Sequence, residues 1–202
     1  MKLLCLILTS CSLAAADTNS FHAFDSYEQL IEGGTVHTLV VDAGREHLVT
    51  RVPRNYAATV ENGTQSVVFN EATGSIVIAM RVTTNWPGVM PGDDALRASA
   101  LAANPGGAVL QVAGCATGYQ PARFVDTTRV LDSLRTLRTR HAFVACPEGI
   151  VEFMFTAREP DFDKGRVVFN LFLSSFRVEI IQVNSGAPPP GRARMALPSG
   201  MD

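Results

Sequence analysis

The feature that most constrains the fold is a succession of short segments rich in β-branched residues, each bounded by residues that favour turns. Such segments are too short for the helices of a globular domain, so they predict strands joined by hairpins. The sharpest hairpin signal is Asn62-Gly63, because both residues tolerate the positive φ of a type I′ turn. The first group of predicted strands spans Val36–Ala43, Leu48–Val52, Ala57–Glu61, Ser66–Asn70 and Ser75–Thr83.

A second group of strands follows residue 108. The segment from Val130 to His141 has two interpretations, because its apolar residues fit helical spacing up to Leu137 and strand alternation from there on. We favour a strand, because the turn at Cys146-Pro147-Glu148-Gly149 then completes a hairpin. The strands of this group are predicted at Val109–Cys115, Pro121–Asp126, Leu137–Ala145 and Ile150–Thr156.

Three segments indicate helices. Asp25–Glu32 begins with a potential N-cap, Asp25, followed three residues later by Glu28. Ala95–Ala103 consists of good helix formers and is preceded by Asp93 as the expected N-cap. The third, Asp163–Phe176, carries one apolar stripe of the kind that faces a core, made of Val168, Phe169, Phe172 and Phe176.

This order of elements predicts the fold class. Strands precede and follow a central helix, and further helices lie near both ends of the chain. The pattern favours an α+β fold in which an antiparallel β-sheet is flanked by helices, as an α/β/α sandwich. It differs from the regular alternation of strand and helix that produces a parallel nucleotide-binding sheet.

The N-terminus resembles a secretion signal. Lys2 is followed by the apolar run Leu3–Leu8, and Ala14-Ala15-Ala16 precedes Asp17 as an expected cleavage site. A second processing site competes with it, because Leu8-Thr9-Ser10-Cys11 resembles a bacterial lipobox in which Cys11 would be lipidated. The first alternative predicts a periplasmic or extracellular protein, and the second predicts a lipoprotein held at the membrane through that lipid.

Composition divides the rest of the chain. We expect a signal peptide over 1–16, an N-terminal segment with a short helix over 17–35, and a single α+β domain over 36–182. Residues 183–202 are rich in Pro, Gly and Ala and include Pro188-Pro189-Pro190, so a disordered tail is predicted there.

The charge balance bears on partners. The formal net charge is -2 at pH 7, which lacks the basic character that nucleic-acid binding requires. A short basic stretch runs from Arg135 to Arg140, and its Arg138 and Arg140 are expected to share the solvent face of a strand. These two arginines, with Trp86 and Met90 in a Pro- and Gly-rich loop, form the predicted contact surface.

Two cysteines, Cys115 and Cys146, remain after the signal. In an oxidising compartment such a pair favours a structural disulfide. The alternative is a pair of unbonded thiols that pack as small hydrophobes.

Other signatures of catalysis and metal binding are missing from the sequence. The four histidines lie far apart, and neither a G-x-S-x-G serine motif nor a phosphate-binding glycine loop occurs. We therefore expect no cofactor and no metal, and we interpret His141 as a hydrogen-bonded, half-buried residue of a strand. The histidines are His22, His37, His47 and His141.

Three stretches resemble the PsbP-like superfamily, which includes an extrinsic photosystem II subunit, a Ran-binding import factor and bacterial envelope lipoproteins. They are the early strand Leu48–Pro53, the strand pair Arg140–Ala145 and Ile150–Phe155, and the closing helix with its strand-like end, Leu173–Val178. The likeness covers roughly residues 36–178. It implies an α/β/α sandwich that serves as a binding or assembly module, and it implies no shared active site.

Two hypotheses for function follow. The leading one is an exported, non-catalytic module of the cell envelope that binds a protein partner or a small ligand. The alternative is a thiol- or histidine-dependent hydrolase that uses Cys146 or Cys115 with His141, which would require a free thiol of lowered pKa.

Overall fold

A computed structural model describes residues 21–43, 45–61, 64–83, 88–118, 120–147 and 149–181. Several predictions concern positions outside these residues. They are the signal peptide over 1–16 with Cys11, the Asn62-Gly63 turn, Trp86 and the tail over 183–202.

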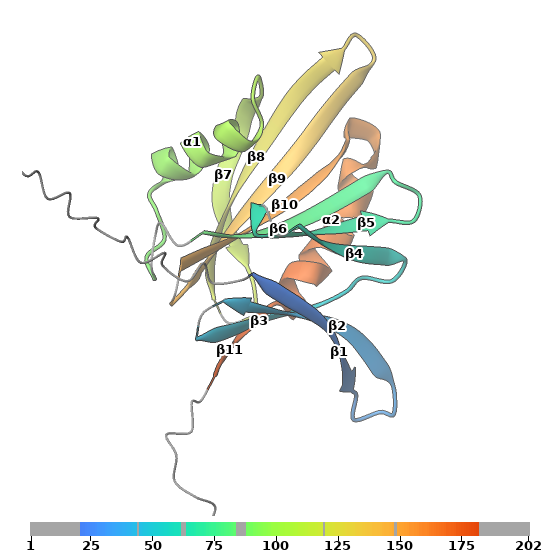
Figure 1. Ribbon diagram of the computed structural model, residues 1–202. Coiled ribbons are helices and arrows are strands. Elements are labelled where there is room, and N and C mark those ends of the chain that lie inside the picture. Colours follow the sequence, from blue (N-terminus) through green and yellow to red (C-terminus); the bar gives the residue numbers. More distant parts are fainter. Residues whose placement is uncertain are drawn as a thin grey trace, which may run out of the picture.

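The described residues form a chain of strands interrupted by two helices (Figure 1). The strands are β1 (His22–Gln29), β2 (Thr35–Ala43), β3 (Glu46–Arg51), β4 (Tyr56–Glu61), β5 (Ser66–Glu71), β6 (Ile76–Thr83), β7 (Ala108–Ala116), β8 (Pro121–Asp132), β9 (Arg135–Cys146), β10 (Gly149–Arg158) and β11 (Arg177–Ile180). The helices are α1 (Asp93–Ala103) and α2 (Glu159–Ser175).

The strands form two sheets, and every pairing in them is antiparallel. The smaller sheet has the order β1-β2-β3-β11, and the larger has the order β4-β5-β6-β10-β9-β8-β7. The chain is therefore an α+β protein dominated by antiparallel sheet, as the strand pattern predicts.

Side chains of the central strand β9 divide the core into two clusters. Ala142 and Val144 pack with the phenylalanines of α2 in the larger cluster, whereas Phe143 and Ala145 pack with Leu96 of α1 in the smaller one. Because successive side chains of a strand point to opposite faces, α1 and α2 contact opposite faces of the seven-stranded sheet.

Helix α2 also connects the two sheets. Phe172, at 2% exposure, packs edge-on against Phe69 of β5 and Phe153 of β10. One turn further on, the Ser175 hydroxyl accepts a hydrogen bond from the backbone N–H of Arg51 in β3 at 3.0 Å. The end of α2 is thereby held between both sheets, which creates the groove described below.

The predicted helix at Asp25–Glu32 is wrong, because this segment forms strand β1 up to Gln29. Its residues pair with β2 along the whole strand, from His22 opposite Asp42 to Gln29 opposite Thr35. The pairing satisfies the backbone of β1 continuously, so tertiary contacts override a capping pattern that is only a local preference.

Three element boundaries also differ from the sequence-based expectation. The N-cap of α1 is Gly92 rather than Asp93, whose carboxylate instead accepts a hydrogen bond from Arg123 at 2.6 Å. Strand β8 continues to Asp132 because β9 begins early enough to pair with it. Helix α2 begins at Glu159, four residues before the predicted start, with a proline in its first turn, where the missing N–H costs nothing.

Candidate functional site

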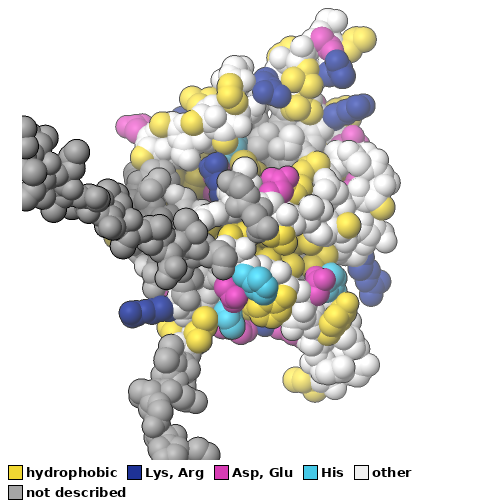
Figure 2. Space-filling view, in the orientation of Figure 1, with side chains coloured by type: hydrophobic (Ala, Val, Ile, Leu, Met, Phe, Trp, Pro, Cys, Tyr) yellow, Lys and Arg dark blue, Asp and Glu magenta, His cyan; other side chains and the backbone are white. Residues whose placement is uncertain are grey.

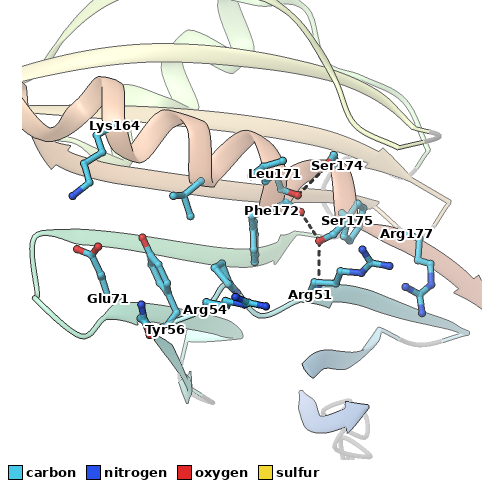
Figure 3. A pocket seen from close by; sticks show the side chains of 14 residues that line it. Arg51, Arg54, Tyr56, Glu71, Lys164, Leu171, Phe172, Ser174, Ser175 and Arg177 are labelled. Atoms are coloured by element: carbon cyan, nitrogen blue, oxygen red, sulfur yellow. Dashed lines mark hydrogen bonds between the residues drawn. The ribbon is translucent and has the colours of Figure 1, made fainter. Parts of the chain in front are cut away.

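A groove of about 790 Å³ lies between α2 and the segment that connects β3 to β4 (Figure 3). One wall is a face of α2 on which Lys164, Val168, Leu171 and Ser175 follow one another at helical spacing. The opposite wall is the run from Pro53 to Tyr56. Its volume lies within the range of small-ligand sites, which is roughly 300–1,000 Å³.

The base of the groove is apolar and firmly held. Phe172 lines it while its ring is fixed in the aromatic cluster of the larger core. Leu171, by contrast, is 67% exposed on the helix beside it. A preformed apolar surface of this kind binds the hydrocarbon part of a ligand without first having to be ordered.

Four cations and one carboxylate line the groove: Arg51, Arg54, Lys164 and Arg177 with Glu71. Arg177 is already engaged, because it forms ion pairs with Glu28 and Glu179. Burial opposes the charge of Arg177, but its hydrogen bonds to those two carboxylates outweigh burial and raise its pKa. Arg51 is also paired, at 3.7 Å from Glu28.

Arg54 and Lys164 differ from these two. Within the described part of the chain, neither has a carboxylate within ion-pairing distance. They lie on the two facing walls of the groove (Figure 3). Their charge is therefore available to an anionic group of a ligand.

Tyr56 adds a hydrogen-bond donor. Its ring projects from the start of β4 towards α2, beside Glu71 (Figure 3), and its buried hydroxyl has no partner among the described residues. Burial, and secondly the charge of Glu71, raise the pKa of Tyr56 to about 12. At neutral pH the phenol therefore keeps its proton and can donate a hydrogen bond.

The two serines of the groove are engaged in structural hydrogen bonds. Ser174 donates to the carbonyl of Leu171 at 2.8 Å, and Ser175 donates to that of Phe172 at 2.7 Å. The described residues that line the groove include neither histidine nor cysteine. The arrangement is suited to binding.

The predicted contact surface at Arg138 and Arg140 is partly wrong. The two arginines do share one face of β9, but it is the face covered by α2 rather than a solvent face. Arg140 is 7% exposed and forms two hydrogen bonds to the buried Asp126, at 2.7 and 2.8 Å. Arg138 lies over the ring of Phe162 in α2 and pairs with Glu159 at 3.3 Å.

Met90, the other described member of that surface, packs against the smaller core beside α1.

Cys115 and Cys146 are not joined in a disulfide, and both thiols are free. Cys115 in β7 is opposite Ala122 in β8, which is opposite Val144 in β9. Two strand spacings, roughly 9–10 Å, therefore separate Cys115 from Val144, and Cys146 lies two residues further along β9. A disulfide requires Cα atoms within about 7 Å.

The predicted thiol–histidine pair is not assembled. Both cysteines pack with the larger core, on the α2 side of the sheet. His141 points to the other face, where its Nδ1 is 2.9 Å from Glu152, which also pairs with Arg81. Burial, and secondly Glu46, raise the pKa of Cys146 to about 12. Burial also raises the pKa of Cys115, against the opposing effects of Arg140 and Arg123.

His141 itself is more deeply placed than predicted, at 1% exposure, although its hydrogen bond is as expected. In the described ranges, no group of three or more His, Cys, Asp or Glu side chains is arranged to hold a metal ion. Neither described helix has the length and apolar character needed to cross a bilayer.

Sequence reasoning missed the groove. From the sequence, Pro53-Arg54-Asn55 indicates only a turn. The apolar stripe of α2 indicates only a face that packs against the core. One signal was present: Lys164, Val168, Leu171 and Ser175 form a second, mixed stripe on α2 beside the phenylalanine stripe. What this stripe faces depends on the fold. Val168, a member of the predicted core-facing stripe, is only half-buried and lines the groove instead.

No family model matches this chain, and no curated protein matches it. Solved structures that it resembles include the Ran-binding protein Mog1p of Saccharomyces cerevisiae, at 11% identity and a TM-score of 0.47, over 77% of this chain and 96% of that one. Another is LpqN of Mycobacterium tuberculosis, described as involved in cell envelope biogenesis, at 9% identity and a TM-score of 0.41, over 78% and 91%.

Cyanobacterial PsbP (CyanoP) from Synechocystis sp. PCC 6803 is similar at 13% identity and a TM-score of 0.41, over 85% of this chain and 99% of that one. A PsbP protein is thus among the solved structures that this chain resembles.

Proposed function

We propose that this protein is a non-catalytic binding module that takes a small amphiphilic anion in the groove between α2 and the β3–β4 connection. The observation that carries the proposal is a pair of cations, Arg54 and Lys164, that line the groove from its two walls and have no ion-pair partner among the described residues, beside the apolar Leu171 and Phe172. An acidic head group would be attracted by these cations, and the hydrocarbon part would contact Leu171 and Phe172.

The energetics favour such a ligand over a neutral one. Arg54 and Lys164 have no carboxylate within ion-pairing distance among the described residues, so an anion gains charge-assisted hydrogen bonds without displacing one. Tyr56 would donate a further hydrogen bond, because its pKa of about 12 keeps it protonated. The exposed side chain of Leu171 would lose its contact with water on binding.

Binding of an anilinonaphthalene sulfonate dye tests the site, because this probe combines an aromatic body with one anionic group. We expect the double substitution Arg54→Gln and Lys164→Gln to weaken dye binding by about tenfold or more, as expected for the loss of charged hydrogen bonds. The measurement is a fluorescence titration of the folded protein.

Arg97→Gln is the matched control, because Arg97 is an exposed cation on α1, away from the groove. It should leave the affinity unchanged. Equal affinities for the wild type and the double variant would refute the anion site.

The proposal places the module in the cell envelope after export, as the N-terminal pattern Lys2, Leu3–Leu8 and Ala14–Ala16 suggests. It also retains the predicted α/β/α sandwich, which is supported by the packing of α1 and α2 against opposite faces of the larger sheet. Mass spectrometry of the protein made in a bacterial host distinguishes the two processed forms. An N-terminus at Asp17 indicates release, whereas an acylated Cys11 indicates anchoring, and an intact Met1 contradicts export.

The hydrolase alternative receives no support. Its two cysteines and its histidine lie on opposite faces of the larger sheet.

A further inference from the structure

The hairpin of β8 and β9 extends beyond the rest of the larger sheet (Figure 1). Pairing of β7 with β8 stops at Thr128, and pairing of β10 with β9 stops at Leu137. Residues 129–136 are therefore paired only with one another. The hairpin ends in a tight turn at Ser133-Leu134.

The end of this hairpin carries three exposed aliphatic side chains. Val130 is 69% exposed, Leu131 is 44% exposed and Leu134, in the turn, is 93% exposed. A single exposed apolar residue is ordinary, but three at one projecting tip form an apolar surface without a partner among the described residues.

Charged side chains lie around these aliphatic residues. Arg135 follows the turn and is opposite Asp132, with which it pairs at 2.6 Å, and Arg129 lies one position further into the stem than Val130. Deeper in the stem, Arg138 pairs with Glu159 at 3.3 Å and is 3.9 Å from Asp126, which also binds Arg140. Arg129 has no ion-pair partner among the described residues, so the end of the hairpin, with Arg129, Arg135 and Asp132, carries a net positive charge. Figure 2 shows hydrophobic, basic and acidic side chains together at this projecting end.

The tip is also rigid enough to act as a unit. The carboxylate of Asp132 accepts a hydrogen bond from the backbone N–H of Leu134 at 3.0 Å and another from the Arg135 side chain at 2.6 Å. The turn is therefore held in place before any contact is made, and little ordering is needed on binding.

We propose that the β8–β9 hairpin docks on a lipid bilayer that contains anionic lipids. Leu134, Leu131 and Val130 enter the boundary between head groups and acyl chains, to a depth of roughly 5–10 Å. Arg135 beside the turn and Arg129 behind Val130 then lie within the head-group layer, where they attract negative lipid charge.

The shape of the tip favours a bilayer over a protein partner. The apolar surface is convex and narrow, so a protein would need a matching hollow, whereas a fluid interface deforms around it. The aliphatic side chains are accompanied by two arginines, Arg129 and Arg135, and by one carboxylate, Asp132, so the surface around them is net positive and suits anionic head groups. This contact does not depend on the groove or on processing at Cys11.

The test uses the full chain with a reporter at the tip, the substitution Leu134→Trp. On vesicles of phosphatidylglycerol and phosphatidylcholine we expect the tryptophan emission to shift to the blue, because the indole enters a less polar layer. The wild type, whose only tryptophan is Trp86, supplies the background. Pure phosphatidylcholine vesicles should give a much smaller shift, because the attraction of the arginines is then lost.

Sedimentation with the same vesicles measures affinity. Leu134→Asp should lower the partition coefficient by about tenfold, and Arg135→Gln by about fivefold. Ile180→Asp is the matched control, because Ile180 is 72% exposed on β11, at the opposite end of the molecule in Figure 1. Residues 1–16 are the same in every variant, so any binding through them is common to all.

An unshifted emission from the Leu134→Trp variant on anionic vesicles would overturn the proposal, as would equal losses for Leu134→Asp and Ile180→Asp. A shift that is the same on neutral and anionic vesicles would overturn the role of the arginines. A partner protein that protects Leu134→Trp from a soluble quencher, where vesicles do not, would identify the tip as a protein-docking surface instead.

Discussion

At the level of single residues, the surroundings of the Cys146 thiol determine its reactivity. Cys146 is 3% exposed, and burial, with a smaller contribution from Glu46, raises its pKa to about 12. At neutral pH its thiolate fraction is therefore much lower than that of a free cysteine.

We accordingly predict that Cys146 resists alkylation in the folded protein. Iodoacetamide at mild alkaline pH should leave Cys146 unmodified in the native state and label it fully in denaturant, because only the thiolate attacks. Peptide mass spectrometry separates Cys146 from the other cysteines. Rapid labelling of native Cys146 would show that the thiol is accessible and ionised, contrary to its position in the core.

At Gly165 of α2, the neighbouring side chains determine which residue can be accommodated. A Cβ atom at this position would be 2.6 Å from the Phe155 ring and 2.9 Å from Ile76. In an isolated helix, alanine is preferred over glycine by about 1 kcal/mol. Here the close approach of the helix to β10 reverses that preference.

We predict that Gly165→Ala lowers the free energy of unfolding by about 1–3 kcal/mol, the usual cost of overpacking. Urea denaturation followed by circular dichroism measures this change. Gly114→Ala in β7 serves as the control, because an added Cβ there has no neighbour within 4 Å, and it should not be destabilising.

At the level of elements, strands β8 and β9 are linked by a buried ion pair. Asp126, at 0% exposure, accepts two hydrogen bonds from Arg140 and a third, at 2.8 Å, from Gln111 of β7. Arg140 also lies over the ring of Phe124, with its guanidinium carbon 4.1 Å from the centroid. The two charges are buried together, so each depends on the other.

Removing one charge should therefore cost more than removing both. We predict that Asp126→Asn destabilises the protein by about 3–5 kcal/mol, because Arg140 is left buried without its counter-charge. The double substitution Asp126→Leu with Arg140→Met should cost less. Equilibrium unfolding of the single and double variants measures the coupling.

Asp163→Asn is the control for that comparison, because Asp163 forms an exposed ion pair with Arg166 on α2. It should leave stability within error. If the double variant were as unstable as Asp126→Asn, the pair would not be coupled as described.

At the scale of the whole molecule, one core joins the two sheets. The larger cluster contains Leu48 of the small sheet, Phe153 of the large sheet and Phe172 of α2. Since the same side chains hold both sheets, neither sheet has a separate large core within the described residues. Both sheets should therefore unfold together.

We predict that Phe172→Ala lowers the free energy of unfolding by about 3–5 kcal/mol, as large-to-small changes of buried phenylalanine do. Far-UV and near-UV circular dichroism should still report coincident unfolding curves. Phe24→Ala, which alters a phenylalanine that is 40% exposed on β1, should have a much smaller effect. Separate transitions in the two spectral regions would contradict a shared core.

The sequence predicted most strands of the fold because its alternation and its turn residues are local properties. Predictions failed where a local pattern competed with a distant partner. Asp25–Glu32 has the caps of a helix but pairs with β2, and Arg140 has the charge of a surface residue but pairs with Asp126 inside the protein. The groove could not be predicted, because Arg54 and Lys164 are far apart in the chain and only α2 packing brings their walls together.

The sequence by itself thus determined the α+β class, the antiparallel strands and the stripe of α2 that enters the core. Tertiary packing decided which faces are covered, and so separated both cysteines from His141 and extended the β8–β9 hairpin past its neighbours. It also placed Arg54 and Lys164 in a groove without an ion-pair partner among the described residues. The physical reason is range: alternation and turn preference act over a few residues, whereas burial and charge pairing depend on side chains brought together by the whole chain.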